Sequence, residues 1–186
     1  MFIDESGFLM SPLVRRTLAV KGQTPQLLHN VRHKGRGRDK VSVIGALTLS
    51  PKLHHLGLFF SSLVNDYFDH SAVAWFLREL LKHLRGPVIV VWDRGPMHQG
   101  PEIRQLQQDF PRLQFEQLPA YAPDLNPVEC VWSYLKWGRL SNYAAPDPQT
   151  LDKTLFQELH CIRDDQDFLR GFWRASDLPL PRALLC

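Results

Sequence analysis

The amino-acid sequence predicts an α/β fold, in which helices flank one mixed sheet of five strands, and two patterns support this prediction. Short runs of β-branched and aliphatic residues, typical of strands, alternate with segments whose apolar residues recur every three or four positions, typical of amphipathic helices. Their order along the chain is strand, hairpin, helix, strand, helix, strand, helix. A length of 186 residues suits a single domain that buries a sizeable core.

The strands are expected in five segments. The first, MFIDESGF, is short and emerges from the sheet where it turns acidic at Asp4. Residues 40–50 and 53–60 are two adjacent apolar runs, which favour a hairpin. Residues 88–92 (VIVVW) form an uninterrupted β-branched run, typical of a central strand covered on both faces. The alternation in residues 113–118 (LQFEQL) indicates a strand closer to the edge of the sheet.

Helices are predicted between and after these strands. Apolar positions from about residue 70 to residue 84 lie on one face of an amphipathic helix, which Gly86 and Pro87 bring to an end. Further helices are expected at residues 101–109, from residue 127 onward and at about 150–162. Residues 1–145 form the main part of the predicted domain, and residues 146–186 form a C-terminal helical extension of it.

Composition and charge exclude several classes of protein. With 44% hydrophobic and 22% charged residues, the chain has the profile of a folded globular protein. No apolar run approaches the ~20 residues that span a bilayer, and no secretory signal opens the chain. The 3 cysteines are widely spaced, which indicates neither a disulfide framework nor a zinc cluster, so a cytoplasmic location is expected. The net charge of +3 permits nucleic-acid binding without establishing it.

Asp4 and Asp93 are the first candidates for a functional site. Each follows an apolar strand, and sites in open α/β sheets form beyond the carboxyl ends of strands. If the two strands are neighbours, the carboxylates face each other, which is electrostatically costly unless a cation lies between them. Mg²⁺ prefers such hard oxygen ligands. Taken alone, Asp4 has the alternative of an ordinary turn residue, and Glu5 competes with it for any role.

Glu129 is the third candidate carboxylate. In LPAYAPDLNPVECVWSYLK, Asn126 is the expected N-cap and Pro127 the first helical residue, so Glu129 projects from a rigid first turn, while Trp132 lies on the apolar side of the helix. A rigid position suits a metal ligand. The alternative is structural, because a Glu three residues after an N-cap is also the acidic member of a capping box.

A basic, glycine-containing segment, RHKGRGRDK, lies between the first two predicted strands at residues 32–40. It is too polar for the core and too rich in glycine for a helix, so it is expected to be a mobile loop. Its charges suit a DNA backbone, although most charge runs are simply solvated. The side chains expected to contact DNA are Arg32, Lys34, Arg36, Arg38, Lys40 and, in the later motif, Lys136.

His98 follows Asp93 by five residues. Three roles are open to it: support for the metal ligands, a phosphate contact, or an exposed position in a loop. Together with Glu5 and Asn126, it forms the set expected to surround and orient the metal ligands.

Three motifs together resemble one family. FIDESGF, the strand end VVWDRGPMH and the segment LPAYAPDLNPVECVWSYLK are similar to the catalytic domain of the mariner-like bacterial insertion-sequence transposases, in the DDE endonuclease superfamily. The resemblance covers residues 1–136, and the third motif is the most specific. The 35 residues between Asp93 and Glu129 resemble the short, nearly fixed spacing of this group.

The resemblance implies a ribonuclease H-like fold in residues 1–145, with the three acidic residues holding two Mg²⁺ or Mn²⁺ ions in the active site. It implies a DNA transposase, in which metal-activated water cleaves a phosphodiester and the freed 3′ hydroxyl then attacks target DNA, with no covalent enzyme intermediate. The implied partner is DNA, both element ends and target. A homodimer on DNA and a cytoplasmic, nucleoid-associated location follow from the same resemblance.

Two departures from the family pattern bear on these expectations. Family members usually have Asn after the second Asp, whereas Arg94 stands here and puts a positive charge beside the proposed metal site, unless its side chain points away. The family also carries an N-terminal helix-turn-helix region that recognises the element ends, and no room is left for one before Asp4. The chain therefore resembles the catalytic half of a split or truncated transposase, whose recognition region is a separate chain or a frameshift product.

Three alternatives to an active transposase are open at this stage. The first is a degenerate remnant that keeps the fold without the activity, which Arg94 favours and the retention of all three carboxylates opposes. The second is a DNA-binding or assembly module that works without catalysis. The third is a ribonuclease H-like nuclease that acts on RNA or branched DNA, and the LNPVE context makes this one the least favoured.

Overall fold

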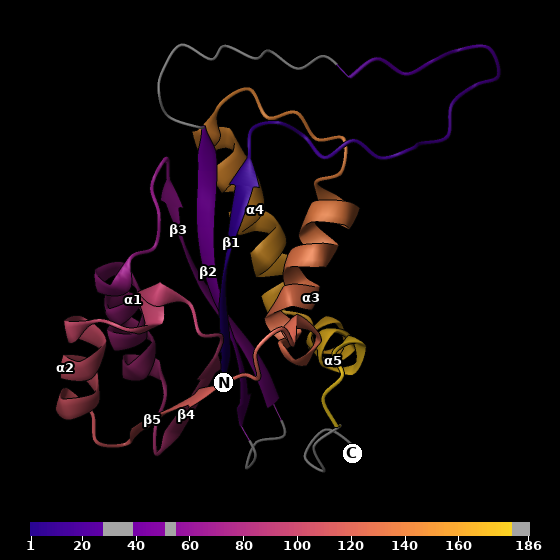
Figure 1. Cartoon of the computed structure of the whole chain (residues 1–186). Helices are drawn as coiled ribbons and strands as arrows, with labels where there is room; N and C mark the ends of the chain where they lie inside the picture. Colours follow the sequence, from indigo (N-terminus) through magenta and orange to yellow (C-terminus); the bar gives the residue numbers. More distant parts are fainter. Residues whose placement is uncertain (28–38, 51–54, 180–186) are drawn as a thin grey trace.

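The computed structural model describes residues 1–27, 39–50 and 55–179, and a mixed sheet lies at its centre (Figure 1). The strands are β1 (Phe2–Leu9), β2 (Lys40–Ser50), β3 (His55–Val64), β4 (Val88–Trp92) and β5 (Leu113–Gln117). Their order in the sheet is β3-β2-β1-β4-β5. The first three strands are antiparallel neighbours, whereas β4 runs parallel to β1, and β5 runs parallel to β4.

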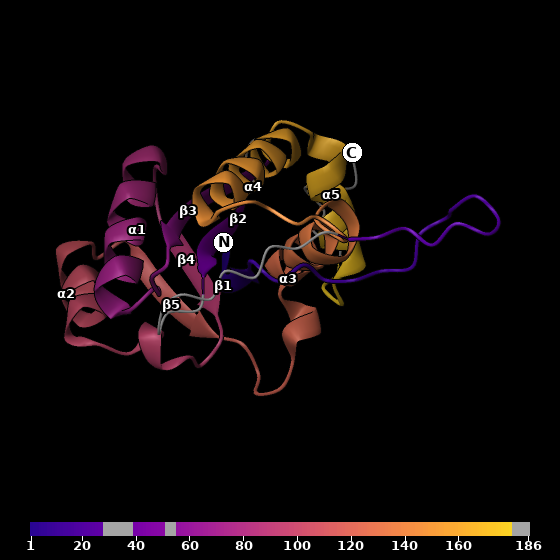
Figure 2. The ribbon, with the colours of Figure 1, turned by 90° about the horizontal axis from the view of Figure 1, so that it is seen from above.

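Helices cover both faces of this sheet, as the two views show (Figures 1 and 2). One face carries α1 (His70–His83) and α2 (Pro101–Asp109). The other face carries α3 (Pro127–Ser133), α4 (Pro148–Arg163) and α5 (Gln166–Ala175). A π-helical turn, Tyr134–Arg139, continues α3, and the short 3-10 helices Pro96–His98 and Pro123–Leu125 precede α2 and α3.

The pleat of the sheet sends alternate side chains into two cores, one on each face. In β1, Ile3 packs in the core beneath α1 and α2, whereas Phe8 packs in the core beneath α3, α4 and α5. Asp4 has the parity of Phe8, and Glu5 has the parity of Ile3. The two neighbouring acids of the first motif therefore point to opposite faces of the sheet.

The predicted α/β class is confirmed, and β2, β4 and α2 have the predicted bounds. Two predictions about strands are wrong. β1 is not short, because it pairs with β2 along its whole length, from Phe2 with Leu47 to Leu9 with Lys40. β4 is not covered on both faces: Ile89 is 49% exposed, because α3, α4 and α5 pack over the first three strands instead.

Helix α5 was not expected, and β3 continues beyond the predicted end at residue 60, to Val64. Residues 53 and 54 of the predicted run lie outside the described residues. The apolar face of α5 has helical spacing that would have allowed its prediction: Leu169, Phe172 and Trp173. These side chains join α4, α3 and the first three strands in one core. Within the described part of the chain, none of the helices has both the length and the hydropathy of a membrane span.

Candidate active site

Asp4, Asp93 and Glu129 line one cavity of about 260 Å³. The strands of Asp4 and Asp93 are neighbours, which meets the condition set in the sequence analysis. Phe2 pairs with Val91, so the same register continued by two residues sets Asp4 beside Asp93. The expectation that Asp4 lies beyond the end of its strand is wrong, because the antiparallel pairing with β2 continues through it. Asp93 does follow its strand directly, and Glu129 lies in the first turn of α3.

Asp4 is a buried acid that accepts a hydrogen bond from an indole N–H. Its side chain is 8% exposed, and one of its oxygens, Oδ2, accepts a 2.8 Å hydrogen bond from the indole Nε1 of Trp132. Burial, together with the charges of Glu129 and the other nearby acids, raises the pKa of Asp4 to about 8, and the bond from Trp132 opposes this rise. Among the described residues, no Lys or Arg forms an ion pair with Asp4.

Asp93 is held at the end of β4 by two nitrogen atoms. Its Oδ1 accepts a 2.8 Å hydrogen bond from the backbone N–H of Gly95 and lies 2.9 Å from Nδ1 of His98. The side chain is nevertheless 60% exposed, so it has room to turn. In the described part of the chain, no three His, Cys, Asp or Glu side chains are placed to hold a metal ion together as they stand. The three carboxylates thus share a cavity without forming a closed cage.

The donor set nevertheless fits a hard divalent cation. Three carboxylates supply oxygen ligands only, which Mg²⁺ and Mn²⁺ accept, and their mutual repulsion makes a cation the natural neutralising partner. Burial, followed by the charge of Asp93, raises the pKa of Glu129, and the nearby ammonium of Lys136 opposes this shift. Without a cation, the cavity therefore favours the protonated forms of Asp4 and Glu129, and a bound cation would favour their charged forms.

Asn126 joins α3 to β1 next to Asp4. Its Oδ1 accepts a 3.2 Å hydrogen bond from Val128 N–H, which confirms it as the N-cap, and its Nδ2 donates a 3.1 Å hydrogen bond to the carbonyl of Ile3. The backbone N–H of Asn126 donates to the carbonyl of Pro123 and not to Glu129. The capping-box alternative for Glu129 is therefore not supported, and its carboxylate is left to face the cavity.

His98 is buried, so its reading as an exposed loop residue is wrong. Its Nε2 lies 3.2 Å from Oε1 of Glu5, and its ring stacks on Trp92 with a centroid separation of 4.3 Å. Burial lowers the pKa of His98, but the hydrogen bond and charge of Glu5 outweigh it and, with those of Asp93, leave this pKa above its usual range. Glu5 thus belongs with His98, on the face opposite Asp4, and does not line the carboxylate cavity.

Arg94 is exposed and is among the residues that line the carboxylate cavity. The position of Arg94 therefore puts a positive charge beside the three carboxylates, which is the first of the two arrangements considered for it. Lys136 is close enough to Glu129 and Asp4 for their charges to raise its pKa, although burial, the larger effect, lowers that pKa overall. Its Nζ donates a 2.7 Å hydrogen bond to Oγ of Ser6, two residues beyond Asp4 on the same face of β1.

Most of the residues expected to contact DNA lie outside the described residues: Arg32, Lys34, Arg36 and Arg38. Lys40 is described, and its assignment to the exposed basic loop is wrong. It begins β2, where it pairs with Leu9, and its buried ammonium lies over the ring of Tyr67. The ammonium of Lys40 therefore makes a cation–π contact inside the fold and does not belong to a DNA-binding surface.

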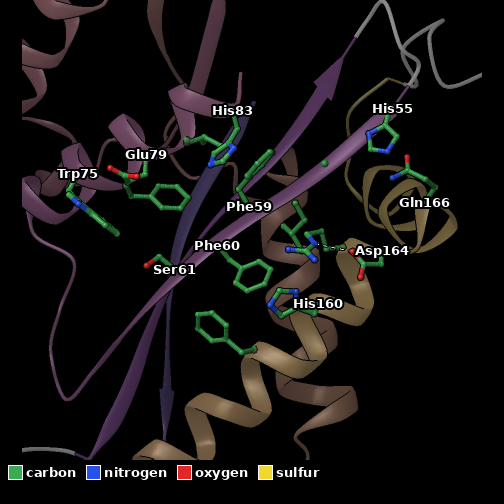
Figure 3. A pocket seen from close by; sticks show the side chains of 16 residues that line it. His55, Phe59, Phe60, Ser61, Trp75, Glu79, His83, His160, Asp164 and Gln166 are labelled. Carbon is green, nitrogen blue, oxygen red and sulfur yellow. Dashed lines mark hydrogen bonds and ion pairs between the residues drawn. The ribbon is translucent and has the colours of Figure 1, made fainter. Parts of the chain in front are cut away.

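A larger cavity, of about 660 Å³, lies along β3 between α1 and α4 (Figure 3). Phe59, Phe60 and Trp75 contribute aromatic walls. The two acidic side chains that line it, Glu79 and Asp164, are each paired with a basic neighbour on the same helix or at its end. This cavity has no excess of negative charge, so the smaller carboxylate cavity is the better candidate for a metal centre.

Trp132 and Ser6 contact the site, although the sequence analysis did not assign them to it. The sequence predicts only that Trp132 is buried and that its indole N–H therefore needs some hydrogen-bond acceptor. The identity of that acceptor depends on how α3 crosses β1, which local patterns do not reveal.

Comparisons with known proteins agree with this geometry. The family described as DDE superfamily endonuclease matches residues 1–152, which confirms the superfamily that the three motifs resemble. A comparison with curated protein sequences finds no match.

The fold is similar to three solved structures of Mos1 transposase. The paired-end complex with the left transposon end has a TM-score of 0.63 at 17% identity, covering 94% of this chain and 50% of that chain. The pre-cleavage transpososome has a TM-score of 0.66 at 16% identity, covering 94% and 52%. The mariner catalytic domain has a TM-score of 0.57 at 13% identity, covering 94% and 76%. The expected ribonuclease H-like fold is thus confirmed, and the chain spans about half the length of the first two.

Proposed function

Because the chain belongs to the DDE superfamily endonucleases, we propose that it is the catalytic domain of a DNA transposase, which cleaves DNA phosphodiesters and joins the freed 3′ ends to target DNA. The observation that carries this proposal is the gathering of Asp4, Asp93 and Glu129 around one cavity. The similarity to a Mos1 paired-end complex with the left transposon end and to a Mos1 Strand Transfer Complex supports DNA as the partner.

Asp4, Asp93 and Glu129 are the proposed ligands of two Mg²⁺ or Mn²⁺ ions. When bound, such cations lower the pKa of the attacking water and stabilise the leaving 3′ oxygen. The raised pKa values of Asp4 and Glu129 support this role, as does the similarity to Mos1 paired-end complexes with Mn and with Mg. Cation binding needs a local rearrangement, for which the exposed side chain of Asp93 has room.

The surrounding residues have proposed roles of their own. Asn126 fixes the start of α3 against β1, and His98 orients Asp93. Lys136, beside two of the carboxylates, contacts a DNA phosphate. The basic side chains Arg32, Lys34, Arg36 and Arg38 contact the DNA backbone.

The remaining parts of the proposal concern the assembly. We take residues 1–145 as the catalytic domain and residues 146–186 as its helical extension, in agreement with the shared core of α3, α4 and α5. The chain acts as a homodimer on insertion-sequence ends, at nucleoid DNA in the cytoplasm. A helix-turn-helix region, on a separate chain or a frameshift product, supplies end recognition.

A second candidate function is a catalytically degenerate remnant that only binds DNA or assists assembly. Two observations favour it: Arg94 lines the carboxylate cavity, and the carboxylates of the described residues form no ready metal cage. The retention of all three acids in one cavity favours the active enzyme.

A plasmid-nicking assay tests the proposal. The chain is incubated with supercoiled DNA and Mg²⁺ or Mn²⁺, and with an RNA–DNA hybrid in parallel. We expect nicking of duplex DNA that requires the metal, that Asp93→Asn and Glu129→Gln abolish, and that Asp124→Asn, at an exposed acid nearby, retains. Metal-independent DNA binding without nicking identifies the remnant, and preferred cleavage of the hybrid identifies a nuclease that acts on RNA.

A further inference from the structure

Trp132 makes a direct hydrogen bond to the most buried acid of the site. Its indole Nε1 donates to Oδ2 of Asp4 at 2.8 Å. The indole is 1% exposed and Asp4 is 8% exposed, so water does not compete effectively for either group. A charged acceptor strengthens such a bond, because carboxylates form shorter and stronger hydrogen bonds than neutral groups do.

The sheet is shaped to admit this indole ring. Gly45 of β2 pairs with Asp4 across the β1–β2 ladder. A Cβ atom at Gly45 would lie 2.8 Å from Cη2 and 2.9 Å from Cζ2 of Trp132, which is closer than real Cβ contacts come. The missing side chain therefore lets the ring pack close to β2 and donate to Asp4 on the neighbouring strand.

The same helix carries Trp132 and Glu129. The two residues are three positions apart, so they lie on adjacent turns of the same side of α3. At the start of α3, Asn126 donates to the carbonyl of Ile3, the residue before Asp4. Two hydrogen bonds from α3 thus fasten β1 at consecutive residues, and both set the distance between Asp4 and Glu129.

We propose that Trp132 is a positioning residue for metal binding, which occupies Oδ2 of Asp4 and leaves Oδ1 as the oxygen that the cation takes. This inference rests on the proposed function, in which Asp4 is a metal ligand. In this role, Trp132 fixes the side-chain rotamer of Asp4. It also fixes the position of Asp4 relative to α3, the helix that carries Glu129. Removal of a group that orients a metal ligand typically weakens metal affinity by about 10- to 100-fold.

The test uses the whole chain and compares Trp132→Phe with Trp173→Phe. Both replace a buried tryptophan of the same core, but Trp173 donates its indole N–H to the carbonyl of Pro179. Mn²⁺ affinity is measured by calorimetry, and the 5 indole N–H signals are followed by nuclear magnetic resonance. We expect Trp132→Phe to lower Mn²⁺ affinity at least about tenfold and Trp173→Phe to leave it unchanged. We also expect the Trp132 signal to shift when Mg²⁺ is added and in Asp4→Ala, which removes the acceptor.

The possible failures of this test are distinct. If the wild-type chain binds neither Mg²⁺ nor Mn²⁺, the proposed function fails. If the wild-type chain binds Mn²⁺ and Trp132→Phe binds it equally well, the positioning role fails and the proposed function stands. A Trp132 signal that is the same in the wild-type chain and in Asp4→Ala, which removes the acceptor, refutes the hydrogen bond itself, whatever the stability of Trp132→Phe.

Discussion

The imidazole of His98 links Asp93 to Glu5: Nδ1 lies 2.9 Å from Oδ1 of Asp93, and Nε2 lies 3.2 Å from Oε1 of Glu5. The ring is buried and stacks on Trp92, so its orientation is set by packing as well as by the two acids. Through His98, the exposed Asp93 at the end of β4 is connected to Glu5, which lies on the face of the sheet opposite Asp4.

Replacing His98 is expected to loosen Asp93 more than it unfolds the protein. His98→Asn retains hydrogen-bonding groups, whereas His98→Ala removes both contacts and leaves a cavity beside Trp92. We expect metal-dependent nicking to fall about 10- to 100-fold in His98→Ala and less in His98→Asn, because an orienting partner of a metal ligand is lost. The control is His70→Ala, at a partly exposed histidine paired with Glu102. Equal activity of His98→Ala and wild type would contradict the role.

Asp4 should make the metal-free protein less stable as pH rises. Its pKa in the fold is about 8, above the usual 3.8, so the folded state holds this proton more tightly than the unfolded state does. The associated stability is complete below about pH 4 and is lost as pH rises toward 8. The free energy of unfolding, measured by urea in the presence of a chelator, is therefore expected to decrease over this window.

Neutralising Asp4 should remove that dependence. Asp4→Asn retains an acceptor for Trp132 and removes the buried charge, so at pH 8 without metal we expect its Tm to exceed that of wild type by at least about 2–4 °C, the shift that 1 kcal/mol produces at this size. Added Mg²⁺ should raise the Tm of wild type and leave Asp4→Asn unchanged. The exposed Asp124→Asn serves as the control. A lower Tm of metal-free Asp4→Asn at pH 8 would sink this prediction.

Much of the fold could be predicted from local patterns, because strands and helices have different apolar periods. The run of residues 88–92 and the helix of residues 101–109 were predicted with the observed bounds. β1 was underestimated since its acids interrupt the apolar pattern, while the pairing with β2 that keeps Asp4 and Glu5 in the strand involves residues about forty positions away.

The three acidic residues of the site could be predicted from the sequence, whereas most of the contacts around them could not. Asp4 and Asp93 follow short apolar runs of the sequence and Glu129 follows an N-cap, which are local signals, and all three line one cavity. The bond from Trp132 and the burial of Lys40 depend on how distant segments pack. Such contacts follow from tertiary structure and leave no periodic trace in the sequence.

Lys136 should contribute to DNA binding through charge. Its ammonium donates to Ser6 and lies near Asp4 and Glu129 without an ion pair to either, so it has the capacity to pair with a bound phosphate. We expect Lys136→Ala to weaken binding of duplex DNA and to lower the slope of log affinity against log salt by about 1, as the loss of one phosphate contact does. Lys153→Ala, at an exposed position of α4, is the matched control and should change neither. An unchanged salt slope in Lys136→Ala, measured by fluorescence anisotropy, would exclude a phosphate contact.

Gly45 should tolerate no side chain, because the indole of Trp132 occupies the space where a Cβ would lie. The nearest atoms belong to a rigid ring and not to a flexible chain end, so relief requires a shift of α3 relative to β2. We expect Gly45→Ala to lower the free energy of unfolding by about 1–3 kcal/mol, the usual cost of overpacking a core, and to weaken Mn²⁺ binding as the Trp132–Asp4 bond is displaced. Gly7→Ala in β1, where nothing lies within 4 Å of the added atom, should have neither effect. If both variants unfold at the same urea concentration as wild type, the close packing of Trp132 against β2 is not what holds the indole beside Asp4.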